Sequence, residues 1–221
     1  MPNSSRVLIV DSQPIAQEGL AIAIRHALPG RLVEFAGSIK AVEAKSASNQ
    51  RYDLIIIDLM LPDVHGFSGF LEVQGRYPTV PIAVISCLMN DRLPYIAREL
   101  GAADYLTKTM PLDMLADRIS RMARGETMFP EIHGTRPPIL APLRARLGSL
   151  SPAQRRVLFG LADGCLNKQI AGSLGICEAT VKAHLTSIYR KLDVLNRAQA
   201  LLLLQPMLTV MPRPEVDWDQ P

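Results

Sequence analysis

Three short runs in the first half of the chain are almost entirely apolar. They read RVLIV from Arg6, DLIII from Asp53 and PIAVIS from Pro81, and each precedes a stretch with helical periodicity. A parallel strand that is buried on both faces needs such a continuous run, whereas a strand with one face in water alternates apolar and polar residues. The pattern therefore predicts a parallel sheet covered by helices on both faces.

Five strand–helix units of this kind fit residues 1–125. We expect strands at 6–10, 32–36, 53–57, 82–86 and 104–106, and helices at about 14–27, 39–48, 66–75, 91–100 and 111–124. This order predicts an α/β domain with a doubly wound, five-stranded parallel sheet of the flavodoxin-like type. Binding sites in such sheets form beyond the carboxyl ends of the strands, where the strand order switches.

The rest of the chain has a different pattern. Residues 126–148 hold four prolines and two glycines, and we expect a linker that is ordered only where Ile132, Ile139, Leu140 and Leu143 find a surface. Residues 149–205 contain four helical patterns and predict a small all-α domain, followed by a proline-rich tail at 206–221. The chain is therefore expected to form two domains with a linker and a tail.

The two expected domains differ in charge. Residues 1–128 carry 13 Lys and Arg against 14 Asp and Glu, a net charge of −1, whereas residues 149–204 carry 7 against 3, a net charge of +4. A basic domain beside a neutral one favours a polyanionic partner for the second domain, although a solvated basic face is the alternative explanation.

Composition narrows the class of protein further. No apolar run approaches the roughly 18 residues that span a bilayer, and the chain enters its first strand without a signal-peptide core. The three cysteines (Cys87, Cys165 and Cys177) lack the spacing of metal ligands and are typical of reduced thiols. We therefore expect a cytoplasmic protein with no membrane partner and no cysteine-bound metal.

The third helical pattern of the second domain, at about 178–192, separates into two faces. One is an apolar stripe of Val181, Leu185, Ile188 and Leu192; the other is an arc of Lys182, Ala183, Thr186 and Arg190. The small side chains of Ala183 and Thr186 allow close approach to base edges, and Lys182 can reach a guanine or a phosphate. Phosphate contacts are expected from Arg190, Lys191 and Lys168. From periodicity alone, an ordinary amphipathic helix is an equal alternative.

Polar residues follow the expected strands of the first domain. They are Asp11, Asp58, Ser86 and Lys108. A carboxylate, a hydroxyl and an ammonium at one rim form a site that handles anions, with Asp58 as candidate nucleophile for an acyl phosphate. Each residue alone is more simply explained as a helix cap or a solvated charge, but four at successive strand ends favour a site.

Residues 6–125 resemble a response-regulator receiver domain. The matching motifs are VLIVD (7–11), DLIIIDLMLPDVHGF (53–67), VISC (84–87) and GAADYLTK (101–108). The resemblance implies that Asp58 is the phosphoacceptor and that Lys108 contacts the phosphoryl group. It also implies a switch formed by Ser86 and Tyr105. Mg²⁺ would be bound by Asp11, Asp58 and the carbonyl of Met60.

Ser12 departs from the receiver pattern, which has a second acid at this position. A hydroxyl cannot replace the charge of a carboxylate, and hard cations depend on ligand charge. We therefore expect weak Mg²⁺ binding and slow phosphorylation of Asp58.

The segment GLADGCLNKQIAGSLGICEATVKAHLTSIYRKLDVLNRAQAL (160–201) resembles a LuxR/NarL-type helix-turn-helix domain. The resemblance implies that Lys182, Ala183 and Thr186 face the major groove and that a fourth helix forms a homodimer through Ala200, Leu201 and Leu204. Cys177 stands where a serine normally caps the DNA-reading helix. Because a thiol is a poor acceptor, we expect a weak cap and a more stable Cys177→Ser variant.

Together these features predict a transcriptional regulator of the NarL/FixJ type that binds double-stranded DNA. Its control would be phosphorylation of Asp58 by a sensor histidine kinase or another phosphodonor. The alternative is an atypical receiver that binds DNA and dimerises without a phosphorylation switch, as Ser12 suggests. An aspartyl-phosphate hydrolase is a third reading. That class needs a second acid two residues after Asp11, where Gln13 stands, so we expect no enzymatic activity.

Overall fold

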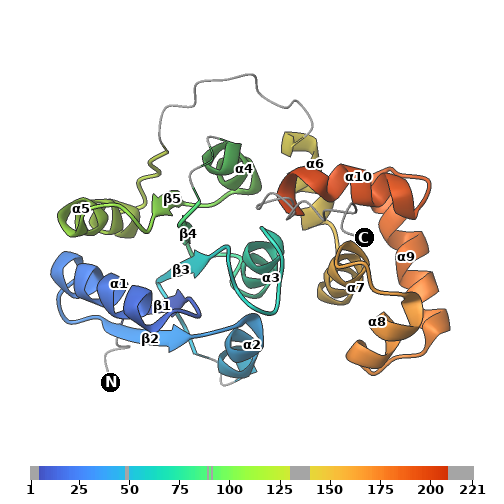
Figure 1. Cartoon of the computed structure of the whole chain (residues 1–221), viewed down its shortest axis with the longest axis horizontal. Helices are drawn as coiled ribbons and strands as arrows, with labels where there is room; N and C mark the ends of the chain where they lie inside the picture. The colour runs from blue at the N-terminus through green and yellow to red at the C-terminus, as the bar shows by residue number, and fades with distance from the viewer. Residues whose placement is uncertain (1–4, 48–49, 89, 91, 130–139, 209–221) are drawn as a thin grey trace, which may run out of the picture.

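The computed structural model describes residues 5–47, 50–88, 90, 92–129 and 140–208. Its first half is a five-stranded parallel sheet with strand order β2-β1-β3-β4-β5 (Figure 1). The strands are β1 (Arg6–Val10), β2 (Leu32–Ala36), β3 (Leu54–Asp58), β4 (Ile82–Ser86) and β5 (Asp104–Thr107). The predicted doubly wound α/β fold is confirmed, with the switch in strand order beside β1.

The sheet separates two apolar cores because successive side chains of a strand point to opposite faces. Leu8 and Val10 of β1 belong to one core, and Val7 and Ile9 belong to the other. Helices α1 (Pro14–Ala27) and α5 (Leu112–Ala123) cover the second face. The first face is covered by α2 (Ile39–Ala47), α3 (Ser68–Arg76) and α4 (Arg92–Leu100).

Helix α3 begins two residues later than the sequence predicts. Gly66 has a φ of 53°, a conformation outside the right-handed helix that glycine adopts readily. The backbone N–H of Phe67 donates to the carbonyl of Met207, 3.1 Å away, so it is held by a residue near the other end of the chain. The local conformation of Gly66 and this long-range hydrogen bond both favour a helix that starts after Phe67.

The described part of the second half, residues 140–208, contains helices and turns but no strand. It contains α6 (Leu140–Gly148), α7 (Pro152–Ala162), α8 (Asn167–Leu174), α9 (Glu178–Leu192) and α10 (Arg197–Leu208). The last four are the predicted helices. The first of them, α7, starts with the expected capping box, in which Ser151 and Gln154 bond each other's backbone N–H groups.

Two boundaries of the second half differ from the prediction. Residues 140–148, expected in a linker, form α6 because Leu143 and Leu147 lie one turn apart and are both buried. Helix α10 continues to Leu208, past the expected start of the tail, because Met207 is buried. Ile132, Ile139 and residues 209–221 lie outside the described residues.

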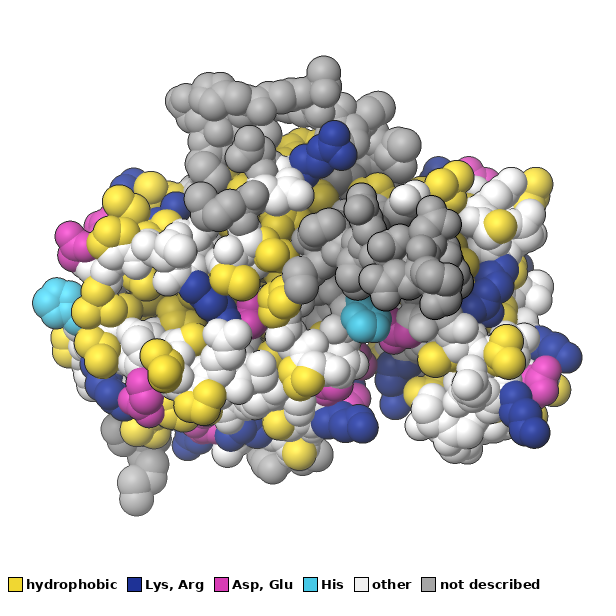
Figure 2. Space-filling model, in the orientation of Figure 1, with side chains coloured by type: hydrophobic (Ala, Val, Ile, Leu, Met, Phe, Trp, Pro, Cys, Tyr) yellow, Lys and Arg dark blue, Asp and Glu magenta, His cyan; other side chains and the backbone are white. Residues whose placement is uncertain are grey.

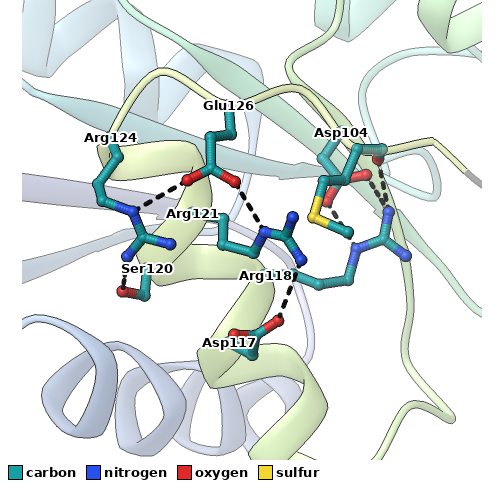
Figure 3. A network of polar contacts seen from close by, with 8 residues as sticks. Asp104, Asp117, Arg118, Ser120, Arg121, Arg124 and Glu126 are labelled. Atoms are coloured by element: carbon teal, nitrogen blue, oxygen red, sulfur yellow. Dashed lines mark hydrogen bonds and ion pairs between the residues drawn. The ribbon is translucent and has the colours of Figure 1, made fainter.

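The chain leaves the first half along the edge of the sheet. The guanidinium of Arg118 forms an ion pair with the buried carboxylate of Asp104, and it donates to the carbonyl of Met128 at 2.6 Å (Figure 3). The carboxylate of Glu126 forms ion pairs with Nε of Arg121 at 2.8 Å and with Nε of Arg124 at 3.0 Å. These contacts fasten the residues after α5 to β5.

The two halves pack against each other. Helix α3 contacts α7, and α4 contacts α6 (Figure 1). One apolar core runs without interruption from the sheet through these helices into α9 and α10. None of the helices in the described residues combines the length and the apolar character that a membrane span requires.

Candidate phosphoryl site and DNA-reading surface

The predicted rim residues of the sheet lie together. Asp11, Asp58 and Ser86 at the ends of β1, β3 and β4 are at most 2% exposed. The ammonium of Lys108, just after β5, lies 2.7 Å from Asp58 Oδ2 and 2.7 Å from Asp11 Oδ2. Parallel strands bring residues distant in sequence to one edge, so the sheet itself assembles this cluster.

The charges of the cluster are strongly coupled. Burial raises the pKa of Asp58; Lys108 counteracts this, Asp11 adds to it, and the net effect is a raised pKa. Burial lowers the pKa of Lys108, but hydrogen bonds to Asp11 and Asp58 outweigh it and the net pKa is raised. Lys108 therefore remains an ammonium that partly neutralises both acids.

The cluster also has the oxygen donors that a divalent cation needs. Asp58 Oδ1 is buried and has no hydrogen-bond partner among the described residues, and Asp11 Oδ2 is engaged there by the ion pair with Lys108. Hard cations bind such carboxylate oxygens. Ser12 is exposed and offers a hydroxyl instead of a third carboxylate. The residues fit Mg²⁺, with one charge fewer than the receiver pattern provides.

The two expected switch residues converge on the loop after β4. The hydroxyl of Ser86 accepts a hydrogen bond from the N–H of Leu88 at 3.1 Å, and the hydroxyl of Tyr105 donates to the carbonyl of Leu88 at 3.4 Å. Burial raises the pKa of Tyr105 to about 12. Tyr105 is therefore in an inward position, joined to Ser86 through one residue of the loop.

Gln13 is a member of the site that the sequence prediction missed. Its side-chain oxygen lies 3.3 Å from the ammonium of Lys108, and its backbone N–H donates to Asp11 Oδ1 at 2.8 Å. The only signal in the sequence is its place two residues after the strand-end acid. Gln13 holds Asp11 and Lys108 in their mutual orientation.

The two predicted faces of α9 are confirmed. Val181, Leu185, Ile188 and Leu192 are buried, whereas Lys182, Ala183, Thr186 and Arg190 are exposed. Lys168 on α8 is exposed as well. Basic side chains gather on the end of the molecule formed by α8 and α9 (Figure 2). We call the five exposed residues, including Lys168, the reading arc.

Lys191 differs from its predicted role. Its ammonium donates to the carbonyl of Ser149 at 2.7 Å and to Gln154 Oε1 at 2.8 Å. Gln154 in turn donates to the hydroxyl of Ser187 at 3.0 Å. These contacts turn Lys191 toward the start of α7, so it anchors α9 instead of projecting with the reading arc.

The prediction of the dimer residues is also corrected in part. Ala200 and Leu204 are fully buried in the core of their own domain, and Leu201 is half-buried. The large apolar side chains that α10 and its preceding turn expose are Leu202, 69% exposed, and Leu195, 85% exposed. A run of four leucines covers every side of a helix, so its pattern could not show which face turns inward.

Cys177 occupies the N-cap position of α9, as predicted, and its side chain makes no capping hydrogen bond. Its sulfur instead lies 3.0 Å from the hydroxyl of Thr180. Glu178 and Lys182 pair at 3.1 Å across the first turn.

Comparison with known proteins identifies the family. The model of the response regulator receiver domain matches residues 7–120, and that of the luxR family of bacterial regulatory proteins matches residues 148–204. The chain belongs to the response regulators with a LuxR-type DNA-binding domain. Residues 7–120 of this regulator are therefore its receiver domain, and residues 148–204 its DNA-binding domain.

The regulator is similar to named proteins along most of its length. It is 30% identical to the glycerol metabolism activator of Pseudomonas putida over 213 residues, which cover 89% of this chain and 93% of that protein. It is 27% identical to the response regulator protein VraR of Staphylococcus aureus over 204 residues, covering 89% and 94% of the two chains. The similarity to both relatives therefore extends along most of the chain.

Solved structures share the fold. The two-component response regulator RcsB in its DNA complex matches with a TM-score of 0.51 at 21% identity, covering 92% of this chain and 99% of RcsB. RcsB of Salmonella typhimurium gives the same TM-score and identity.

Proposed function

We propose that this regulator binds double-stranded DNA through the reading arc and that phosphorylation of Asp58 controls its activity. The observation that carries the proposal is the buried Asp58 carboxylate, held 2.7 Å from Lys108 at the rim where the parallel strands end. A carboxylate at such a rim can accept a phosphoryl group from a donor, so that the donor's bond to phosphorus breaks as an Asp58 oxygen forms the acyl phosphate.

The other residues of the rim have supporting roles in this proposal. Lys108 contacts a phosphoryl oxygen, and Ser86 and Tyr105 adjust the loop at Leu88 to the modified state. Asp11, Asp58 and the Met60 carbonyl would hold Mg²⁺, which neutralises phosphoryl charge. Because Ser12 adds no charge, we propose that Mg²⁺ binds weakly and that Asp58 is labelled slowly.

We propose one class of partner for each half of the chain. A sensor histidine kinase or a small phosphodonor supplies the phosphoryl group, and DNA binds the second domain. The solved complex of RcsB contains DNA, which supports the second partner. We propose that two chains pair on DNA through Leu202 on the exposed side of α10 and Leu195 in the turn before it. We further propose that the protein acts as a regulator and not as an enzyme.

Incubation with acetyl phosphate and Mg²⁺, followed by intact-mass measurement, tests the phosphoryl site. We expect partial addition of one phosphoryl group, none in Asp58→Asn, and more labelling at low Mg²⁺ in Ser12→Asp. Absence of labelling in both the natural chain and Ser12→Asp would overturn control by phosphorylation.

The second candidate function is DNA binding without a phosphorylation switch. The observations that favour it are the exposed Ser12 and the ammonium of Lys108 already shared between the two acids. Beryllofluoride, which mimics an aspartyl phosphate, separates the candidates. A change in DNA affinity on its addition supports the switch, and an unchanged affinity supports the second candidate.

A further inference from the structure

The receiver domain packs against one particular side of the DNA-binding domain. Leu71 of α3 lies beside Leu147 of α6 and Phe159 of α7, and all three are less than 10% exposed. The gap that remains between them has a volume of about 20 Å³, room for about one water molecule. The three apolar side chains are therefore shielded from solvent. We call this contact the docking interface.

Two arginines of the second half lie directly on receiver glycines in this interface. A Cβ atom at Gly75, in the last turn of α3, would collide with the guanidinium of Arg155. A Cβ atom at Gly101, which follows α4, would lie 2.5 Å from the guanidinium of Arg144. Each cation thus lies at the carboxyl end of a receiver helix, where the helix dipole attracts positive charge.

Polar contacts connect the loop after the phosphoacceptor to the same interface. The loop runs from Asp58 to α3, and its Phe67 N–H donates to the carbonyl of Met207 in the last turn of α10 at 3.1 Å. The Nε2 atom of His65, in this loop, lies 3.8 Å from Oδ1 of Asp163 at the end of α7. The loop that follows Asp58 therefore contacts the DNA-binding domain directly, through one hydrogen bond and one polar contact.

The docking interface and the reading arc are on different sides of the DNA-binding domain. Helices α6 and α7 lie between the receiver and α9 (Figure 1). With the receiver docked, Lys182, Ala183, Thr186, Arg190 and Lys168 are all exposed. Leu195 and Leu202 are exposed too. Docking leaves both the surface for DNA and the proposed pairing surface open.

We infer that the docked chain is competent to bind DNA, and that docking positions the receiver instead of masking the recognition helix. This inference rests on the proposed DNA binding by α9. It implies that modification of Asp58 acts on the pairing of chains or on the last turn of α10, because the reading arc needs no unmasking.

A chain that is locked in the docked form tests this directly. His65→Cys and Asp163→Cys, in a chain whose own three cysteines are replaced by serine, are joined by a short bis-maleimide. The probe is a duplex selected from a random library by the natural chain, and DNA affinity is compared before and after cross-linking. We expect a change of no more than about threefold.

Failure of the inference and failure of the proposed function would give different results. A loss of affinity of about tenfold or more on cross-linking, the size of an ordinary allosteric effect, would overturn the inference while leaving DNA binding intact. If the duplex fails to bind before cross-linking as well, the proposed function itself falls, and the inference with it.

A variant that separates the receiver from the DNA-binding domain provides a second test of DNA affinity. Leu71→Arg places a charge against Arg155, and Leu112→Arg on the exposed face of α5 serves as the matched control. Small-angle scattering should show a larger radius of gyration for Leu71→Arg alone, with DNA affinity within about threefold of the control. A rise in affinity of about tenfold or more would mean that docking masks the DNA site, contrary to the inference.

Discussion

At the scale of single residues, Cys177 begins the DNA-reading helix with a thiol that caps nothing. A serine hydroxyl at this position would accept a hydrogen bond from the first turn. Cys177→Ser should therefore raise stability by about 1 kcal/mol, or about 2–4 °C in a melting experiment. Cys165→Ser, which is not at a cap, should give no such gain. An unchanged or lower melting temperature for Cys177→Ser would contradict the explanation.

Lys191 and Arg190 are neighbours with different tasks. Lys191 is bonded to Ser149 and Gln154, whereas Arg190 is exposed on the reading arc. Lys191→Met should weaken DNA binding without changing its salt dependence, because no phosphate contact is lost. Arg190→Met should reduce the slope of log K against log salt by about 1. DNA-binding titrations at several salt concentrations measure both slopes. A reduced slope for Lys191→Met and an unchanged slope for Arg190→Met would contradict these roles.

Glu34 shows how one carboxylate joins several elements. It accepts from Arg6 of β1 at 2.6 Å, Lys45 of α2 at 2.9 Å and the Tyr52 hydroxyl at 3.1 Å. Burial raises the pKa of Glu34, but these three partners outweigh it and leave the pKa lowered. The ionised form is therefore favoured by folding, and its contribution is present above the unfolded pKa and lost as pH falls through the folded one.

Glu34→Gln should accordingly destabilise the protein at neutral pH by about 1 kcal/mol, since the pairs are partly exposed. The difference from the natural chain should shrink as pH falls below the ordinary glutamate value of 4.5. Denaturant unfolding of the variant and the natural chain at pH 7 and at acid pH measures the stability difference and its change with pH. A difference that does not change with pH would show that packing, not charge, is responsible.

At the scale of elements, α10 has one side in the core and one side in solvent. Ala200 and Leu204 are buried, while Leu202 is 69% exposed, and Leu195 in the turn before the helix is 85% exposed. Leu202→Asp should reduce pairing in sedimentation experiments on DNA and leave the melting temperature nearly unchanged. Leu112→Asp on α5 is the control for an added surface charge. Normal pairing by Leu202→Asp would exclude this face of α10.

At the scale of the whole molecule, the docking interface contains a cation that lacks an acidic partner among the described residues. Arg155 Nε is buried without a hydrogen bond, and one terminal nitrogen lies 3.4 Å from the Gly148 carbonyl. Burial lowers the pKa of Arg155. Partial removal of this cation from water is unfavourable, whereas attraction to a helix dipole is worth only about 0.3–1 kcal/mol at a partly exposed position, so we expect the charge to oppose docking.

Arg155→Met keeps the apolar stem and removes this charge. We expect a melting temperature about 2–4 °C higher, corresponding to roughly 1 kcal/mol for a chain of this size. Arg190→Met, at an exposed position, should leave the melting temperature unchanged. A lower melting temperature for Arg155→Met would mean that attraction to the end of α3 outweighs desolvation.

The sequence alone determined the sheet, the rim of Asp11, Asp58 and Lys108, and the two faces of α9. These features depend on local periodicity and on the rule that parallel strands end together. The family resemblance added the roles of Ser86 and Tyr105, and the structure places both at one loop. What each residue does at the rim remains a proposal.

Four features could be seen only in the folded chain. They are the helix at 140–148, the inward side of α10, the direction of Lys191 and the contact between the two halves. Each depends on partners far away in the chain. Leu143 is buried by other helices, Lys191 is oriented by Ser149 and Gln154, and Phe67 is bonded to Met207. A local pattern records which side chains are apolar or long, but the surface that meets them is created only when the chain folds.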